Sequence, residues 1–228
     1  MLSFDSDTSI QQRNTFEGRR VLSFSLFSLA NLPSIKLTKA LLGGFKVWEC
    51  SIDLCQYLVD LYQLDSAVPD GNANEEEDWN HTTCKQLQGK SVLELGCGQG
   101  LPGILCLHQG ARNVVFQDFN EEVLRSVTHP CVQKNVSSRK EVFDRVDRYV
   151  SGDWTTCSDV LGKHEFDLIL TAETIYEPKS VAPLLDLLEW CLNPNTGLVL
   201  VAAKVYYFGV GGGIAPFEEA VRNQGKEG

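Results

Sequence analysis

The sequence predicts an α/β protein built on a doubly wound, mainly parallel sheet. From residue 91 onward, short β-rich runs alternate with helical patterns. These runs are continuously apolar, as expected of strands covered by helices on both faces. The first run ends in the glycine-rich stretch VLELGCGQG, at the kind of position where open α/β sheets bind ligands. Repeated strand–helix–strand units of this kind form parallel sheets with right-handed crossovers.

The composition limits the possible partners. The 228 residues are 43% hydrophobic and 22% charged, which is enough apolar material for one sizeable core. The net charge of −10 argues against a general electrostatic attraction to nucleic acid or to an anionic membrane, because both require positive surface. We therefore expect no direct nucleic-acid binding and no membrane partner.

The cysteines and one apolar run bear on the cellular compartment. The 8 cysteines form no C-x-x-C pair, and no His stands at ligand spacing from them, so we expect reduced thiols and no metal. The apolar run of residues 21–32 is interrupted by serines and is too short to span a bilayer. We interpret that run as a strand or packing helix and expect an intracellular protein.

A lead-in, a helix and a loop are predicted before the sheet. Residues 1–42 have weak periodicity and are interpreted as a lead-in that packs on a single domain of residues 43–228. From Trp48 to Tyr62 apolar residues recur every three or four positions, which predicts a helix with one buried face. The acidic, turn-rich residues 65–86 then predict a solvated loop.

Five strands and their helices are predicted after this loop. The expected strands are residues 91–96, 113–119, 146–154, 166–174 and 197–204. Helices are expected at residues 101–110, after residue 120, and at residues 178–191. No internal repeat is visible.

The glycine-rich stretch narrows the kind of ligand. Gly96, Gly98 and Gly100 stand between the first strand and a helix, where glycine lets the backbone turn tightly and approach a ligand. A dinucleotide fingerprint would have its third glycine at Leu101, so an NAD-dependent oxidoreductase is disfavoured. Asp118 follows the second strand, at the distance along the chain where an acid takes a ribose hydroxyl pair.

With Glu94 before the glycines and an acid after the second strand, the chain resembles the class I methyltransferases that use S-adenosylmethionine. In SGDW, Asp153 is then a candidate acceptor for the adenine amine, and Trp154 a candidate surface for the ring. The alternative is a surface turn with a half-buried Trp.

KVWEC, at the start of the first helix, fits the same cofactor. The face of Trp48 and the carboxylate of Glu49 would provide cation–π and ion-pair contacts to a sulfonium cofactor, and backbone amides would take its carboxylate. The alternative is a core Trp that staples the helix.

Six stretches in order make residues 43–213 similar to the protein-histidine N-methyltransferase family: GGFKVWEC, LELGCGQG, FQDFN, SGDW, DLILTAETIYEP and KVYYFGVGGG. Its known member methylates one histidine of a large-subunit ribosomal protein. The resemblance implies the same reaction with S-adenosylmethionine as cofactor and S-adenosylhomocysteine as product. It also implies a cofactor site lined by Val47, Trp48, Glu49, Cys50, Ser51, Gly96, Gln117, Asp118, Phe119, Gly152, Asp153, Trp154 and Ala172.

Such a reaction asks for orientation more than for a strong base. A neutral imidazole, with an unperturbed pKa of about 6.5, already has a free lone pair. Glu173 is our candidate acceptor for the ring's other N–H, and Tyr176, Tyr206 and Phe208 are candidate walls of the target slot. The alternative for Glu173 is a loop carboxylate bonded to backbone amides.

The partner and compartment follow from the same resemblance. An acidic chain suits a basic protein substrate, such as a large-subunit ribosomal protein. We expect a monomer located in the cytoplasm and nucleus. Two other functions stay open: a lysine methyltransferase of the same superfamily, and a cofactor-binding regulatory protein without activity.

The end of the chain departs from the class I pattern. Class I methyltransferases close the sheet with sixth and seventh strands that form an antiparallel hairpin. This sequence has one helix after the fifth predicted strand. We therefore expect a sheet truncated before its last two strands, with the fifth strand at an exposed edge and the activity of this form in question.

Overall fold

The structure, a computed structural model, describes residues 12–16, 19–24, 46–64, 85–136 and 139–224. The predicted acidic loop falls almost entirely outside these residues. Cys84 and most of the lead-in and of the apolar run 21–32 fall outside them as well.

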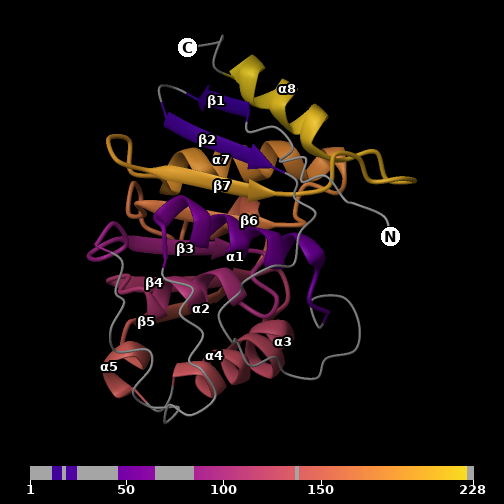
Figure 1. Cartoon of the computed structure of the whole chain (residues 1–228). Coiled ribbons are helices and arrows are strands. Elements are labelled where there is room, and N and C mark those ends of the chain that lie inside the picture. Colours follow the sequence, from indigo (N-terminus) through magenta and orange to yellow (C-terminus); the bar gives the residue numbers. More distant parts are fainter. Residues whose placement is uncertain (1–11, 17–18, 25–45, 65–84, 137–138, 225–228) are drawn as a thin grey trace, which may run out of the picture.

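A seven-stranded sheet crosses the molecule in the order β1-β2-β7-β6-β3-β4-β5 (Figure 1). Its strands are β1 (Gln12–Phe16), β2 (Arg19–Phe24), β3 (Ser91–Leu95), β4 (Asn113–Asp118), β5 (Val146–Ser151), β6 (Leu168–Ala172) and β7 (Leu198–Ala202). All neighbouring strands are parallel except the β1–β2 pair. The five predicted strands are present as β3 to β7, and the doubly wound α/β class is confirmed.

Helices cover both faces of this sheet. In chain order they are α1 (Glu49–Tyr62), α2 (Leu101–His108), α3 (Glu121–Val123), the π-helix η2 (Leu124–Thr128), α4 (His129–Val136), α5 (Lys140–Phe143), α6 (Trp154–Cys157), the 3-10 helix η3 (Pro178–Ser180), α7 (Val181–Cys191) and α8 (Ile214–Gln224). In Figure 1, α1 and α2 lie in front of the sheet and α7 lies behind it.

Two hydrophobic cores, one on each face, explain the continuously apolar strands. Val92 of β3 belongs to the core formed with α1, α2 and α4, whereas Leu93 belongs to the core formed with α7 and α8. Both side chains are fully buried. Successive strand residues point to opposite faces, and here each face meets a helix layer.

The expectation that the fifth predicted strand lies at an exposed edge is wrong. This strand, β7, pairs with β6 on one side and with β2 on the other, where Val21 lies opposite Val199. β1 then adds to β2 in antiparallel orientation. A hairpin that precedes α1 in the chain therefore occupies the positions beyond β7, and we missed it because neighbours in a sheet need not be neighbours in sequence.

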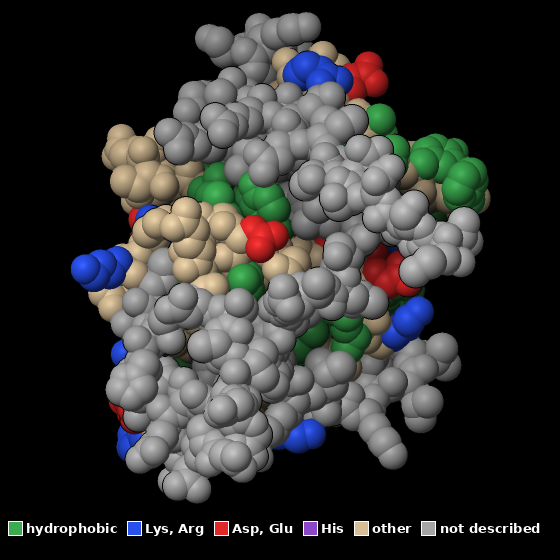
Figure 2. All heavy atoms as spheres, viewed as in Figure 1, with side chains coloured by type: hydrophobic (Ala, Val, Ile, Leu, Met, Phe, Trp, Pro, Cys, Tyr) green, Lys and Arg blue, Asp and Glu red, His purple; other side chains and the backbone are tan. Residues whose placement is uncertain are grey.

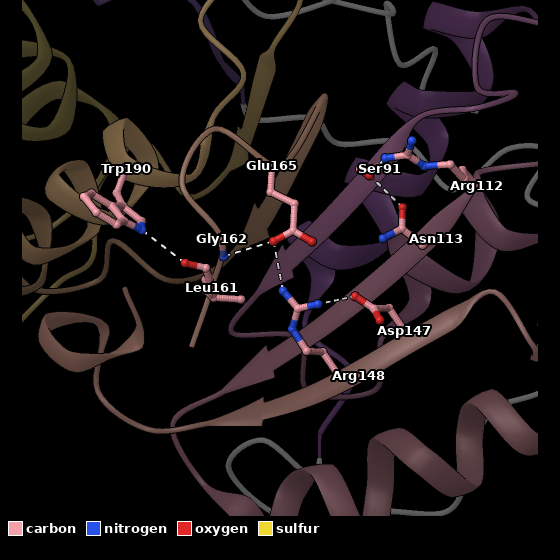
Figure 3. Close-up of polar contacts among 9 residues, drawn as sticks. All are labelled: Ser91, Arg112, Asn113, Asp147, Arg148, Leu161, Gly162, Glu165 and Trp190. Atoms are coloured by element: carbon pink, nitrogen blue, oxygen red, sulfur yellow. Dashed lines mark hydrogen bonds and ion pairs between the residues drawn. The ribbon is translucent and has the colours of Figure 1, made fainter. Parts of the chain in front are cut away.

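Side-chain contacts join the amino ends of the strands (Figure 3). The hydroxyl of Ser91 on β3 donates to Asn113 on β4 at 2.7 Å and accepts from Arg112 at 2.6 Å. On β5, Arg148 pairs with Glu165, in the loop before β6, at 2.9 Å. The first contacts join β3 to β4 and the second joins β5 to the loop before β6, away from the strands' carboxyl ends.

Two further observations concern the helices and the cysteines. No helix among the described residues is long and apolar enough to cross a membrane. The seven cysteines within the described ranges are buried, and none of them is paired in a disulfide.

Candidate functional site

A cavity of about 610 Å³ lies at the carboxyl ends of β3 to β6. From β3 the chain adds β4 and β5 on one side and then β6 and β7 on the other, so the cavity is at the topological switch point of the sheet. The predicted site residues that line it are Val47, Trp48, Ser51, Gly96, Gly98, Asp118, Phe119, Gly152, Asp153, Trp154, Ala172, Glu173 and Tyr176.

Two glycines of the loop after β3 are required by close packing. Gly96 has φ +62°, and a Cβ there would lie 2.6 Å from the Thr174 side chain beyond β6. Gly100, with φ +72°, precedes α2, and its Cβ would lie 2.9 Å from the Phe116 ring on β4. Gly100 therefore packs the helix against the sheet and does not line the cavity, contrary to our expectation.

Asp118 holds the glycine loop at the end of β4. Its Oδ2 accepts the backbone N–H of Gly98 at 3.0 Å, and its Oδ1 accepts that of Asn120 at 3.1 Å. Burial raises the pKa of this carboxyl, although these backbone hydrogen bonds oppose the shift. Each carboxylate oxygen can accept a further hydrogen bond, so Asp118 remains able to take a hydroxyl pair at the cavity wall.

Gln117 does not line the cavity but lies fully buried behind it. Its Nε2 donates to the carbonyl of Gly152 at 2.9 Å. Its Oε1 accepts from the Gly96 amide at 3.3 Å and from the Trp154 indole at 3.0 Å. One amide thus joins the ends of β3, β4 and β5 and fixes the polar edge of a Trp that does line the cavity.

Three further predicted contacts are corrected. Glu94 is buried under the glycine loop, where its Oε2 accepts the Gly103 amide of α2 at 2.8 Å. Burial raises its pKa to about 8, against the opposing effect of that hydrogen bond. Glu49 is exposed and Cys50 lies in the core, so neither lines the cavity. Of the five predicted contacts at residues 47–51, only Val47, Trp48 and Ser51 line the cavity. Trp48 and Ser51 are separated by about one helical turn.

Trp48 occupies the N-cap position of α1 and is 39% exposed, so it does not staple the core. The Lys46 ammonium lies 4.9 Å from its ring centroid, in cation–π contact. The ring thus contacts one cation of the chain itself, Lys46. Its contact with a sulfonium stays a prediction.

Asp153 lines the cavity and caps the short helix α6. Its Oδ1 accepts from the Thr155 amide at 2.9 Å and from the Thr155 hydroxyl at 2.8 Å. These hydrogen bonds lower the pKa of Asp153, so the carboxylate is negative at neutral pH. The predicted contact with an adenine amine stays a prediction.

Glu173 is the most constrained carboxylate of the cavity. It adopts a left-handed conformation, with φ +58°, that is uncommon for a residue other than glycine and recurs at functional sites. Its backbone amide donates to Ala202 of β7 at 2.9 Å. Its side-chain Oε2 accepts the hydroxyl of Tyr207, whereas Oε1 is buried and has no N–H or O–H partner among the described residues.

The aromatic residues after β6 and β7 differ from our expectation. Tyr176 lines the cavity, but Tyr206 and Phe208 do not. They are 50% and 91% exposed and contact each other edge to face at 5.1 Å. Figure 2 shows hydrophobic side chains at the edge of the molecule where this loop projects. Tyr207, which we had not assigned, is the aromatic that turns inward.

Charge on the cavity wall favours a cationic ligand. Four carboxylates line it against two ammonium groups, Lys46 and Lys179. Lys179 pairs with Glu177 at 3.2 Å. On α1 the pKa of Asp53 rises to about 6, first through burial and then through the carboxylates of Glu49 and Glu173. Among the described residues no cluster of His, Cys, Asp and Glu fits a metal ion.

Other lining residues were not predicted. They are Lys46, Cys97, Gln99, Leu101, Asn120, Thr155, Thr174, Glu177, Lys179, Ser180 and Pro183. Six of them lie inside a quoted motif, and all the others except Pro183 lie within two positions of one, so the motifs marked the right segments without identifying these side chains.

A switch-point cavity with a glycine loop, an acid after the next strand and aromatic walls defines an α/β protein that binds a nucleoside-like cofactor. The family model described as "Lysine methyltransferase" matches residues 36–207, and the chain belongs to that family.

Relatives with a named activity specify the kind of methyltransferase that this chain resembles. Histidine protein methyltransferase 1 homolog of Dictyostelium discoideum is 42% identical over 180 residues, which cover 79% of this chain and 49% of the relative. The Bos taurus protein of the same name is 34% identical over 236 residues, which cover 93% and 56%. The resemblance to histidine protein methyltransferases is thereby confirmed, and the chain spans about half the length of these relatives.

Solved structures are similar at lower identity. A TehB-like SAM-dependent methyltransferase from Corynebacterium glutamicum has a TM-score of 0.44 and 22% identity, covering 60% of this chain and 65% of that one.

Proposed function

We propose that this chain transfers a methyl group from S-adenosylmethionine to an imidazole nitrogen of a protein histidine, and that the histidine belongs to a basic protein of the large ribosomal subunit. The observation that carries the proposal is Glu173, whose buried Oε1 lacks an N–H or O–H partner among the described residues and whose side chain lines the cavity. A substrate of this kind would be met in the cytoplasm or nucleus.

The cavity residues fit the cofactor. Bound there, S-adenosylmethionine supplies a methyl group on a positively charged sulfur, open to in-line displacement by a lone pair. Asp118 has acceptor capacity for the ribose hydroxyls, while the Trp48 and Trp154 rings offer apolar faces. The net negative wall suits a cationic ligand.

The acceptor is argued from hydrogen-bonding needs. A neutral imidazole has one N–H and one lone pair, and only the nitrogen with the lone pair can attack. If the Glu173 carboxylate accepts the ring N–H, the lone pair of the other ring nitrogen stays free to attack the methyl group. The ring becomes positively charged as the methyl group is transferred, and the carboxylate stabilises that charge.

The substrate class is argued from charge. The chain carries a net charge of −10, and the cavity mouth includes the carboxylate of Glu177. An acidic surface raises the encounter rate with a basic protein at low ionic strength. Ribosomal proteins are basic because they bind RNA, so they satisfy this condition.

A lysine acceptor is the second candidate, because the matching family model is described as lysine methyltransferase. The two acceptors differ in pH dependence. A histidine is neutral above a pKa of about 6.5, so its methylation rate should level off near neutral pH. A lysine, with a pKa near 10.4, should react about tenfold faster for each pH unit well beyond neutrality.

The experiment is transfer of a labelled methyl group from S-adenosylmethionine to purified large-subunit ribosomal proteins, followed by mass spectrometry of the modified residue. We expect label on one histidine and a rate that levels off above neutral pH. Asp118→Ala should weaken cofactor binding by about tenfold or more, because it removes a carboxylate that holds the glycine loop. Asp144→Ala, which removes a surface carboxylate paired with Lys140, is the matched control.

Label on lysine would replace the acceptor and keep the reaction class. Cofactor binding without any label would favour the alternative of a cofactor-binding regulatory protein without activity. Unchanged cofactor affinity in Asp118→Ala would contradict the assignment of the cofactor site.

A further inference from the structure

The loops after β6 and β7 are fastened to each other through backbone hydrogen bonds. The amides of Gly212 and Gly213 donate to the carbonyls of Tyr176 and Ile175, at 3.1 and 2.9 Å. A Cβ on Gly212 would overlap the Tyr176 backbone, so only glycine allows this approach. The GVGGG motif therefore serves as a clasp, which we define as residues 209–213, between two loops at the cavity.

The clasp fixes Tyr207 in one orientation. Its backbone amide donates to Gly212 at 3.0 Å, and its carbonyl accepts from Gly211 at 3.0 Å. Its ring packs edge to face on Tyr176 with centroids 6.5 Å apart. The backbone and the ring of Tyr207 are thus both held by residues that line or adjoin the cavity.

The hydroxyl of Tyr207 has a defined donor and acceptor. It accepts the amide of Lys204 at 3.3 Å and donates its proton to Oε2 of Glu173. Burial, followed by the bond to Glu173, raises the pKa of Tyr207, so the hydroxyl keeps its proton throughout the neutral range.

Cys50 lies near the same carboxylate. Burial and a hydrogen bond to Glu173 raise the pKa of its thiol, which therefore stays neutral. A thiol is a weak donor, so the stronger bond that orients the carboxylate comes from Tyr207.

We infer that Tyr207 is a positioning residue for methyl transfer: its hydroxyl holds Oε2 of Glu173 and thereby fixes the carboxylate at the cavity wall, where it accepts the N–H of the acceptor ring. This inference rests on the proposed function. Tyr207 does not line the cavity and acts through Glu173. Its removal should therefore lower the rate of transfer while the cofactor site is left intact.

The experiment compares Tyr207→Phe, Glu173→Gln and the double variant, with the large-subunit protein fraction as methyl acceptor. Initial rates are measured over a range of S-adenosylmethionine concentrations, and binding of S-adenosylhomocysteine is measured by calorimetry. Tyr149→Phe is the matched control, because it removes a hydroxyl from a tyrosine of β5 that does not line the cavity.

We expect Tyr207→Phe to lower kcat by about tenfold or more, the usual effect of losing a preorganised charge-assisted hydrogen bond. KM for S-adenosylmethionine and the affinity for S-adenosylhomocysteine should stay within about twofold of wild type. In the Glu173→Gln background the same change should have little further effect, because two residues that act through one contact are not additive.

The outcomes separate the inference from the proposed function. A Tyr207→Phe rate equal to that of Tyr149→Phe, or full additivity with Glu173→Gln, would overturn the inference and leave the proposed function standing. Loss of cofactor affinity in Tyr207→Phe would also overturn it, since a general loss of structure would then explain the rate. A wild-type chain that labels no histidine would overturn the proposed function, and the inference with it.

Discussion

Burial determines the role of Glu94 at the scale of single residues. The carboxyl lies under the glycine loop and accepts one backbone N–H from α2, and its surroundings include the Asp118 carboxylate. These surroundings favour the neutral form, and its pKa of about 8 leaves it largely protonated at neutral pH. An acid that precedes a glycine loop in sequence thus anchors the helix start here without contacting the cavity.

This ionisation predicts a pH-dependent stability. The folded-state pKa of about 8 lies above the ordinary value of 4.5, so the folded chain binds this proton more tightly than the unfolded chain does. The stabilising contribution is complete below the lower value and is lost as pH rises toward the higher one. Glu94→Gln cannot ionise, so its free energy of unfolding relative to wild type should increase over that interval by a few kcal/mol, at about 1.4 kcal/mol per pKa unit.

Urea unfolding of both proteins at several pH values between about 4.5 and 8 would measure this difference. Asp144→Asn, at a surface ion pair with Lys140, should give a small difference that stays flat over the interval. A Glu94→Gln difference that is equally flat would show that the buried carboxyl does not retain its proton.

Single residues also show how far sequence reasoning reaches. Gly96, Asp118 and Glu173 were predicted at the cavity and line it, because each follows directly from a strand end. Gln117 was predicted at the cavity together with Asp118, but it lies buried behind the wall, because alternation along a strand sends neighbouring side chains to different sides. Tyr207 could not be separated from its aromatic neighbours, because the turn that directs one ring inward depends on contacts with a distant loop.

At the scale of elements, the glycine clasp explains how the GVGGG motif contributes to the cavity. Gly212 and Gly213 let the loop after β7 lie against the backbone after β6. In the sequence, GVGGG belonged to a stretch that carries the family resemblance, but its structural role could not be predicted, since the partner backbone is more than thirty residues away. Its physical role is close approach between two loops.

Gly212→Ala tests that role. A methyl group would collide with the Tyr176 backbone, so we expect the free energy of unfolding to fall by about 1 to 3 kcal/mol. Methyl transfer should fall as well, because Tyr207 loses its hold on Glu173, while the cofactor affinity should change little. Gly209→Ala in the same loop is the control: a Cβ there meets nothing within 4 Å, although φ +84° costs about 1 kcal/mol for alanine. Equal transfer rates in the two variants would contradict the clasp.

The amino-terminal hairpin determines the extent of the sheet at the scale of the whole molecule. Five residue pairs join β2 to β7, and β1 continues the sheet beyond them. The five central strands could be predicted from their apolar runs. The hairpin could not, because its pairing with β7 joins segments separated by most of the chain.

Deletion of residues 1–24 tests whether this hairpin protects β7. Without β2, the apolar strand β7 would present unpaired N–H and C=O groups at a sheet edge, a site where strands of other molecules can add. We expect the deleted chain to aggregate at lower concentration and to melt about 5 °C or more below the full chain, since a few kcal/mol corresponds to several degrees in a domain of this size. Binding of S-adenosylhomocysteine should be largely preserved, because the cavity is built at the ends of β3 to β6. Deletion of residues 1–11 alone leaves both strands in place and is the matched control. If the two deletions have the same melting temperature and solubility, β7 does not depend on the hairpin for its protection, and the helix layers alone must stabilise that edge.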